Sequence, residues 1–304
     1  MPKVKDVAID VTMTNFIRAY KFENQSLIAD VVAPPQRVTS RTGRWKTTGM
    51  DTIDVDVSNY AGDRSKLNEI NFDVAETTYF ADRFGLKELV TDDEMAERGL
   101  NAANEASIRL LHKNKLMNEI RIQNLAATTT HTTALGADWD TAANVPEEIN
   151  AAQNAFVNNL GFPANAIVIP DDVARELAVN VNLRKEMETA GSLAGTGADF
   201  FRWQNGINLP NPFFGMQLIV PNARYNSGTK GARTLAQVWS KEVYLLYIDP
   251  ASRSMTWAIQ PQAQDYTVYR WRTDDPRGFY YSVEFKRDAV EVTSEAIYKL
   301  TNVT

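Results

Sequence analysis

The sequence predicts an α+β fold in which two long β-hairpins flank a very long helix and a compact α/β region. Three observations support this prediction. Apolar and polar residues alternate with period 2 in residues 53–58, and again in 266–272 and 279–286, as in strands with one solvated face. An apolar stripe at helical spacing follows Thr91. Short apolar strands alternate with helical patterns in residues 145–248.

The composition is typical of a globular protein and includes few of the residue types, cysteine and histidine, that commonly carry out catalysis. Of 304 residues, 44% are hydrophobic and 23% charged, and no run approaches the roughly 18 apolar residues of a membrane-spanning helix. The N-terminal sequence MPKVKDVAID lacks an apolar signal-peptide core, which predicts a protein kept inside the cell. The net charge of −6 provides no overall basic field for nucleic acid.

Cysteine is absent, and His112 and His131 are the only histidines. Thiolate chemistry and cysteine-ligated metals are therefore excluded, and a histidine triad or histidine-rich metal site is disfavoured. No HExxH, GxSxG, EF-hand or Walker sequence occurs. We expect no catalytic residue, no cofactor and no metal, and hence no enzyme.

Residues 1–33 predict an extended arm with one short helix around Asn15–Phe22. Residues 34–76 predict a long β-hairpin, since Gly43, Gly49 and Gly62 mark turns and a structureless loop of about 40 residues is improbable. The hairpin residues that we single out carry segregated charge, basic first and acidic after the turn: Arg37, Arg41, Arg44, Trp45, Lys46, Asp51, Asp54 and Asp56.

Two interpretations of this charge pattern remain open. The charges either face water on a solvated hairpin, or they lie on a projecting arm that contacts a neighbouring subunit. The second interpretation gains support because a long hairpin with little apolar content has weak reason to exist alone, and because Trp45 suits a contact surface.

One long helix is predicted over residues 92–127, which would span roughly 54 Å. Thr91 and Glu94 form a capping-box pattern at its start. Gly99 weakens the helix by about 1 kcal/mol relative to alanine and is a candidate hinge. His112 is predicted to be solvated, opposite an apolar stripe formed by Ala96, Leu100, Ala103, Leu110 and Met117.

The α/β region is predicted to begin with a helix at Pro146 that Gly161 ends. Its buried face is formed by Ile149, Ala152, Phe156 and Leu160. Strands are expected at 166–169, 216–220 and 243–248, and a helix follows Pro170. The glycine-rich run Gly191–Gly197 lacks phosphate-loop spacing, so we interpret 189–215 as a loop.

The last fifty-odd residues predict a long antiparallel hairpin. Tyr266–Arg272 and Phe279–Lys286 alternate on either side of the turn TDDPRG. Its aromatic stripe is expected to pack against the long helix rather than to bind a ligand.

Two aspartate pairs are the remaining candidates for chemistry, because a glycosidase requires two carboxylates. Asp171 and Asp172 form one pair, and Asp274 and Asp275 form the other. Both pairs lie at turns, where aspartate serves local hydrogen bonding. His131 has no partner at metal-ligand spacing and is interpreted as structural or solvated.

Three sequence segments, in this order, carry a resemblance to a known family: GRWKTTGMDTIDVD (43–56), VPEEINAAQNAFVNNLGFPANAIVIPDDVARELAVN (145–180), and VWSKEVYLLYIDP (238–250) leading into YTVYRWRTDDPRGFYYSVEFKRDAVEV (266–292). Over nearly its whole length the chain resembles the major capsid proteins of tailed bacteriophages, which have the Hong Kong 97-like fold. The resemblance implies an N-terminal arm (1–33), an extended loop (34–76), a peripheral domain (77–140) with spine helix 92–127, an axial domain (141–250), a peripheral-domain β-hairpin (251–288) and a C-terminal strand (289–304) that returns to the axial domain.

The resemblance also implies a function. We expect a structural virion protein that self-assembles into hexamers and pentamers of an icosahedral shell around double-stranded DNA, without sequence-specific DNA binding and without a membrane. Scaffolding, portal and decoration proteins are expected partners, and assembly is expected in the host cytoplasm. About ninety residues precede the spine helix, so a separate scaffolding protein or none is expected. Lys46 and Lys66 lie where some relatives carry a cross-linking lysine, but no partner asparagine is evident.

Three alternatives stay open. An encapsulin-like nanocompartment would have the same fold and enclose a protein cargo. A tail or adaptor protein would form rings or tubes without a closed shell. A carbohydrate-active hydrolase would depend on one of the aspartate pairs.

Overall fold

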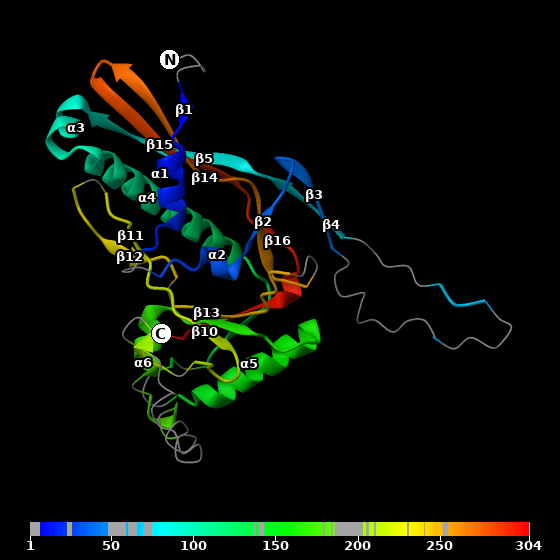
Figure 1. Cartoon of the computed structure of the whole chain (residues 1–304). Helices are drawn as coiled ribbons and strands as arrows, with labels where there is room; N and C mark the ends of the chain where they lie inside the picture. The colour runs from blue at the N-terminus through cyan, green and yellow to red at the C-terminus, as the bar shows by residue number, and fades with distance from the viewer. Residues whose placement is uncertain are drawn as a thin grey trace.

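Figure 1 shows the computed structural model as two lobes, with the long helix α4 (Leu100–Ala127) lying along the upper one. The structure describes residues 7–22, 26–47, 59, 66–69, 75–136, 138–139, 143–178, 180–183, 185, 203–204, 207–209, 211–229, 231–239, 241–251 and 255–303. Helices α1, α3 and α4 lie with the hairpin β14–β15 in one lobe, and α5, α6, β10 and β13 form the other.

The start of the N-terminal arm packs on the first lobe, whereas Ala29 and Val32 farther along belong to the core of the second lobe. Helix α1 (Val11–Ala19) begins after Asp10, whose carboxylate accepts a hydrogen bond of 3.0 Å from the backbone N–H of Met13. It therefore starts earlier than the predicted Asn15. The short strand β1 (Ala8–Ile9) pairs with β14, and helix α2 (Ala29–Val32) follows α1.

The larger sheet carries the first lobe. Among the described residues it has six strands: β1 and β14 (Ala258–Asp274), β15 (Arg277–Arg287) and β5 (Asp82–Thr91) in that order, with β2 (Pro35–Arg37) and β16 (Val290–Glu291) paired to β14. The predicted terminal hairpin is thereby confirmed, because β14 and β15 pair antiparallel from Gln262 to Arg287.

The predicted helix 92–127 is divided in two, so a continuous helix is wrong. Helix α3 (Asp92–Arg98) has the predicted capping box between Thr91 and Glu94, and helix α4 (Leu100–Ala127) follows. Gly99 separates them with φ +61°, a conformation that side-chain-bearing residues rarely adopt. The sequence therefore locates the break correctly, and the role of Gly99 as a hinge stays a prediction.

The apolar stripe predicted for this helix is correct only in part. Ala103 and Leu110 are buried against the sheet, together with Tyr281, Val283 and Phe285 of β15, which confirms the predicted packing of the aromatic stripe. Leu100 and Met117, in contrast, are exposed. The buried face includes the smaller residues Ala102, Ala106 and Ser107 instead.

His112 is half-buried rather than solvated. Its ring lies 5.0 Å from that of Phe22, in an edge-to-face contact between α4 and the N-terminal arm. Burial lowers the pKa of His112 below its usual range.

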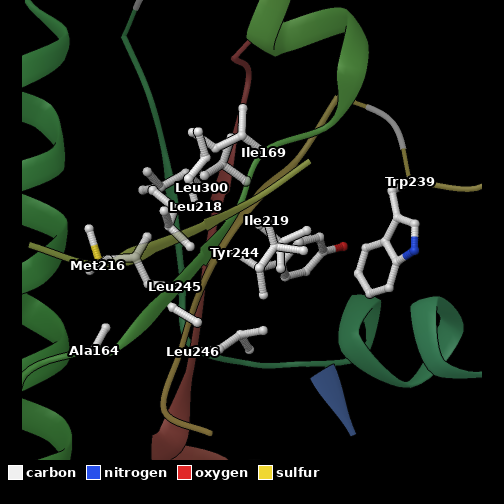
Figure 2. Close-up of a cluster of buried hydrophobic side chains, with 14 of the residues drawn as sticks. Ala164, Ile169, Met216, Leu218, Ile219, Trp239, Tyr244, Leu245, Leu246 and Leu300 are labelled. Atoms are coloured by element: carbon white, nitrogen blue, oxygen red, sulfur yellow. The ribbon is translucent and has the colours of Figure 1, made fainter. Parts of the chain in front are cut away.

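The smaller sheet forms the second lobe. Its five described strands run in the order β10 (Gln217–Ile219), β7 (Ala166–Val168), β13 (Val243–Leu246), β17 (Ile297–Thr301) and β6 (Thr132–Ala134). Figure 2 shows its apolar side chains, among them Leu245, Leu246 and Leu300, gathered into one core. The C-terminal strand β17 thus lies between β13 and β6.

Helix α5 (Val145–Leu160) confirms its prediction, since Ile149, Phe156 and Leu160 are buried and Gly161 adopts the left-handed conformation with φ 80°. Helix α6 (Asp171–Leu177) follows β7. A short 3-10 helix (Ser294–Ala296) and three two-stranded sheets complete the described elements. The sheets pair β3 (Thr42–Thr47) with β4 (Ala75–Phe80), β8 (Trp203–Gln204) with β9 (Ile207–Asn208), and β11 (Arg224–Asn226) with β12 (Leu235–Gln237). The run Gly191–Gly197 lies outside the described residues.

Candidate functional site

The predicted charged hairpin begins as a two-stranded sheet at the side of the first lobe (Figure 1). Strands β3 and β4 pair antiparallel, from Thr42 opposite Phe80 to Thr47 opposite Ala75. The predicted strand at 53–58 lies outside the described residues. A two-stranded sheet has little stability of its own, so its base must be held by the body of the protein.

Trp45 holds this base. Its side chain is only 9% exposed and packs in a small core with Ile259, Val290 and Val292 of strands β14 and β16 and the segment after them, while Val38 and Tyr79 cover the cluster. Because β3 alternates, the burial of Trp45 directs its two neighbours, Arg44 and Lys46, toward the opposite, solvated face.

A hollow of about 460 Å³ lies at the hairpin base. Three cations, two hydroxyl-bearing side chains and two apolar side chains line it: Arg37, Arg44, Lys46, Thr39, Tyr79, Val38 and Trp45. No carboxylate is part of this described lining. We call this hollow the basic pocket.

One carboxylate from β4 partly neutralises the basic pocket. Glu76 accepts from Arg44 Nη1 at 2.7 Å and lies 3.1 Å from Lys46 Nζ. The hydrogen bond from Arg44, then that from Lys46, holds the pKa of Glu76 below its usual range. Arg37 has no ion-pair partner within the described parts of the chain. Among the residues that the structure describes here, three cations and one carboxylate leave a local charge of +2.

The structure assigns the predicted contact residues to different places. Arg37 lies in β2, beside β14, and not in the hairpin as predicted, because Pro35–Arg37 pairs in parallel with Gln260–Gln262. Arg41 turns away from the basic pocket and contacts Phe80 and the carbonyl oxygen of Ala81. Asp51, Asp54 and Asp56 lie outside the described residues. Contact of any of the eight residues with a neighbouring subunit stays a prediction.

A second group of charged residues lies where the arm, α4 and the second lobe meet. Glu119 of α4 is fully buried and accepts three hydrogen bonds: from the backbone N–H groups of Ile28 at 3.0 Å and Ala29 at 2.8 Å, and from Trp239 Nε1 at 2.7 Å. Burial raises the pKa of Glu119, and its three donors act in the opposite direction. Figure 2 shows Trp239 beside Tyr244 of the second lobe.

The arm is also joined to β14 and β15 by a buried arginine. The Arg287 side chain is 4% exposed, and its guanidinium contacts Asp30 at 2.7 Å and Asp265 at 3.2 Å. It also lies 5.0 Å from the ring centre of Tyr266. Glu119 and Arg287 together fix the arm to helix α4 and to the hairpin β14–β15. We call this group the α4 junction.

Neither aspartate pair forms an evident catalytic site. Asp171, at the start of α6, is 4% exposed, is held by Arg175 and also lies 3.6 Å from Arg224. Asp172 accepts from the backbone of Val173, and Asp274 ends β14 at the hairpin turn. These are the local roles that aspartate takes at helix starts and turns.

His131 is half-buried, and its ring lies 3.3 Å from the amide of Asn159. Among the described residues, no group of three His, Cys, Asp or Glu side chains is placed to hold a metal ion. Within those same residues no helix combines the length and hydropathy of a membrane span.

Sequence reasoning missed most residues of these sites, among them Glu76, Tyr79 and Glu119. Tyr79 lines the basic pocket and Glu76 contacts two of its cations through strand pairing across thirty residues or more, which no short-range pattern signals. A regular β3–β4 register would have identified Glu76 as the partner of Lys46. Glu119 lies in a helix whose buried residues do not form a single apolar stripe, and glutamate is ordinarily expected at the surface.

No protein-family model matches the sequence, and no curated protein matches it. Solved structures match over almost the whole chain. A phage-related protein from Bordetella bronchiseptica RB50 is 15% identical with a TM-score of 0.69, over 97% of each chain. The capsid of cyanophage P-SCSP1u is 10% identical with a TM-score of 0.59, over 93% of this chain and 90% of that one.

The holo-SrpI encapsulin complex from Synechococcus elongatus PCC 7942 is 10% identical with a TM-score of 0.55, over 97% of this chain and 95% of that one. The chain therefore has the fold that phage capsid proteins share, and the predicted α+β fold class is confirmed. The domain boundaries drawn from the sequence stay a prediction.

Proposed function

We propose that this chain is the major subunit of a protein shell, the capsid of a tailed bacteriophage, which self-assembles into hexamers and pentamers around double-stranded DNA. The observation that carries the proposal is the structural likeness, over 93% of the chain and not over one lobe alone, to the capsid of a cyanophage. A likeness of that extent covers both lobes of the chain.

The proposed contact residues of the shell lie at the base of the hairpin and on the adjacent strand β2. Arg37, Arg44 and Lys46 line the basic pocket on an exposed face, where charges favour particular partners more than they add affinity. Trp45 acts from within the subunit by fixing the hairpin base. The same contact repeated around an axis closes a ring. Gly99, between α3 and α4, is the proposed hinge that lets one subunit fit rings of five and six.

Further partners belong to the same proposal. A chain of net charge −6 would enclose DNA without holding it tightly, and no sequence-specific contact is proposed. Scaffolding, portal and decoration proteins would join the shell, which would assemble in the host cytoplasm and reside in the virion.

An encapsulin-like nanocompartment is the second candidate, because the same fold occurs in an encapsulin complex. The two functions differ in what the shell encloses. Shells purified from cells that carry the native genetic surroundings of this chain would contain DNA in the first case and a cargo protein in the second.

The test of the proposal is assembly. We expect the purified chain, imaged by negative-stain electron microscopy beside a sizing run, to form closed shells or rings of five and six. If it instead stays monomeric, both alone and with the other head proteins encoded beside it, the proposed function is wrong.

A further inference from the structure

We propose that the basic pocket is an anion site for phosphate groups, and that its ligand is a small oligophosphate of the pyrophosphate class. The inference does not depend on the proposed function, because the described lining of the pocket belongs to a single subunit. The volume of about 460 Å³ lies within the range of sites for small ligands, roughly 300–1,000 Å³. The basic pocket therefore accommodates more than a single small ion.

The basic pocket lies along the edge of β3 that faces away from β4. Arg44 and Lys46 project from one face of β3 and Trp45 from the other, yet all three line the pocket. Side chains from both faces of a strand converge only around one of its edges, and β4 is paired to the other edge. Residues 37–39, which precede β3 in the chain, complete the wall. A bound anion is thus reached from both faces of β3 and from the preceding segment.

The lining carries the charge that an oligophosphate requires. Arg37, Arg44 and Lys46 supply three cations, and Glu76 reduces the charge of the described residues to +2. Arginine binds phosphate through paired N–H groups, whereas lysine acts as a compact point charge. The contacts of Glu76 with Arg44 at 2.7 Å and with Lys46 at 3.1 Å hold these two cations side by side. Less side-chain freedom is therefore lost when a ligand binds.

Tyr79 adds a neutral donor by crossing over a glycine. Gly43 and Tyr79 are paired residues of β3 and β4. A Cβ atom on residue 43 would lie 2.6 Å from Tyr79 Oη and 2.8 Å from its Cζ, so the phenol ring lies directly over Gly43. The hydroxyl groups of Tyr79 and Thr39, which both line the pocket, can each donate a hydrogen bond to a phosphate oxygen.

Trp45 makes the site rigid and limits the kind of ligand that it accepts. Its side chain packs on Ile259, Val290 and Val292, so the strand that carries Arg44 and Lys46 is fixed to the body of the subunit. Because Trp45 is only 9% exposed, it offers too little surface for an aromatic ring to stack on. Recognition in the basic pocket therefore depends on the phosphate groups of the ligand and not on a nucleobase.

Titration calorimetry with sodium pyrophosphate tests the site. The purified chain is titrated in about 0.15 M NaCl, where the Debye length of about 8 Å screens diffuse attraction. We expect saturable binding of one pyrophosphate per chain. Arg37→Gln and Lys46→Gln should each weaken binding at least about tenfold, because each removes a charged donor. Arg233→Gln, an exposed arginine between β11 and β12, is the matched control and should change Kd by less than about twofold.

Tyr79→Phe distinguishes a built site from a diffuse surface charge, because it removes one hydroxyl group and leaves every charge in place. We expect it to weaken pyrophosphate binding about threefold or more without a change in the urea denaturation midpoint. Binding by Tyr79→Phe that equals that of the wild type would overturn the inference. Absence of pyrophosphate binding, or binding that Arg37→Gln and Lys46→Gln leave unchanged, would overturn it as well.

A short DNA duplex identifies the source of the phosphate groups. Binding of pyrophosphate but not of the duplex supports a free oligophosphate. If the duplex competes with pyrophosphate on the wild type and loses affinity with Arg37→Gln, the groups belong to a nucleic-acid backbone and the assignment to an oligophosphate is wrong. Normal shells from a chain that binds no pyrophosphate would overturn this inference alone, whereas failure to form shells would contradict only the proposed function.

Discussion

The basic pocket and the α4 junction are both built from charged residues, but they differ in how far those residues are exposed to solvent. At the hairpin base, Arg44 and Lys46 share Glu76 at the surface, with side chains about two-thirds exposed. In the α4 junction, Glu119 is fully buried and satisfied by three donors from two other segments.

This contrast assigns the two groups different roles. Exposed ion pairs contribute little to stability because water screens them, so their charges remain available to select a partner. A buried carboxylate is costly to leave without its hydrogen bonds, so the α4 junction fixes how arm, helix and second lobe sit together. The subunit would thus be made rigid at one site and selective at the other.

Loss of the buried carboxylate should have the largest effect on folding. Glu119→Ala leaves two backbone N–H groups and the indole N–H of Trp239 without an acceptor. We expect it to lower the free energy of unfolding by about 3–5 kcal/mol, measured by urea denaturation. Glu105→Ala, on the exposed side of the same helix, is the control and should change it by no more than about 0.5 kcal/mol. Equal effects of both would contradict the role given to the α4 junction.

Mild acid should produce a smaller effect through His112. Burial lowers the pKa of His112 in the folded protein, so the unfolded chain takes up the proton first as pH falls below about 6.5. The contribution of the neutral ring is full above pH 6.5 and is lost as pH falls toward the folded pKa. The unfolding free energy of the wild type should therefore decrease from pH 7 to pH 5 by more than that of His112→Gln. If the unfolding free energies of the wild type and of His112→Gln change with pH in parallel, the contact with Phe22 does not depend on the charge of His112.

Glu76→Gln should have the smallest effect on stability, although it alters the basic pocket most directly. The pKa of Glu76 is lowered, so its ion pairs are present above pH 4.5 and are lost as pH falls through the folded pKa. Because the group is solvated, we expect no measurable change in the denaturation midpoint at pH 7. Shell yield should rise or stay level, since the basic pocket gains positive charge. A large loss of stability would mean that Glu76 holds the hairpin base.

Local patterns in the sequence were sufficient for elements whose partners are close in the chain. Helix α5 and its Gly161 cap follow from spacing within 16 residues, and the β14–β15 hairpin follows from alternation about a strong turn. Helix α4 was less predictable. Its first half packs on the larger sheet, whereas Ile122 and Ala126 belong to the core of the second lobe, so one stripe does not describe both faces.

The sites were predictable only where they follow from one segment. Charge segregation identified Arg44 and Lys46 as candidates, but the place of Arg37 depends on pairing with Gln262, more than two hundred residues away. Glu119 carries no local signal at all, because its burial results from the meeting of three segments. Long-range contacts of this kind can be read only from the fold.

The most direct test of the central claim replaces residues 48–74 by Asn-Gly. Thr47 and Ala75 are paired residues, so a two-residue turn can close the hairpin there while leaving the Trp45 core and the basic pocket in place. Electron microscopy and urea denaturation of this variant should show a subunit as stable as the wild type that forms no closed shells. Normal shells from the shortened chain would contradict the claim that the hairpin joins neighbouring subunits.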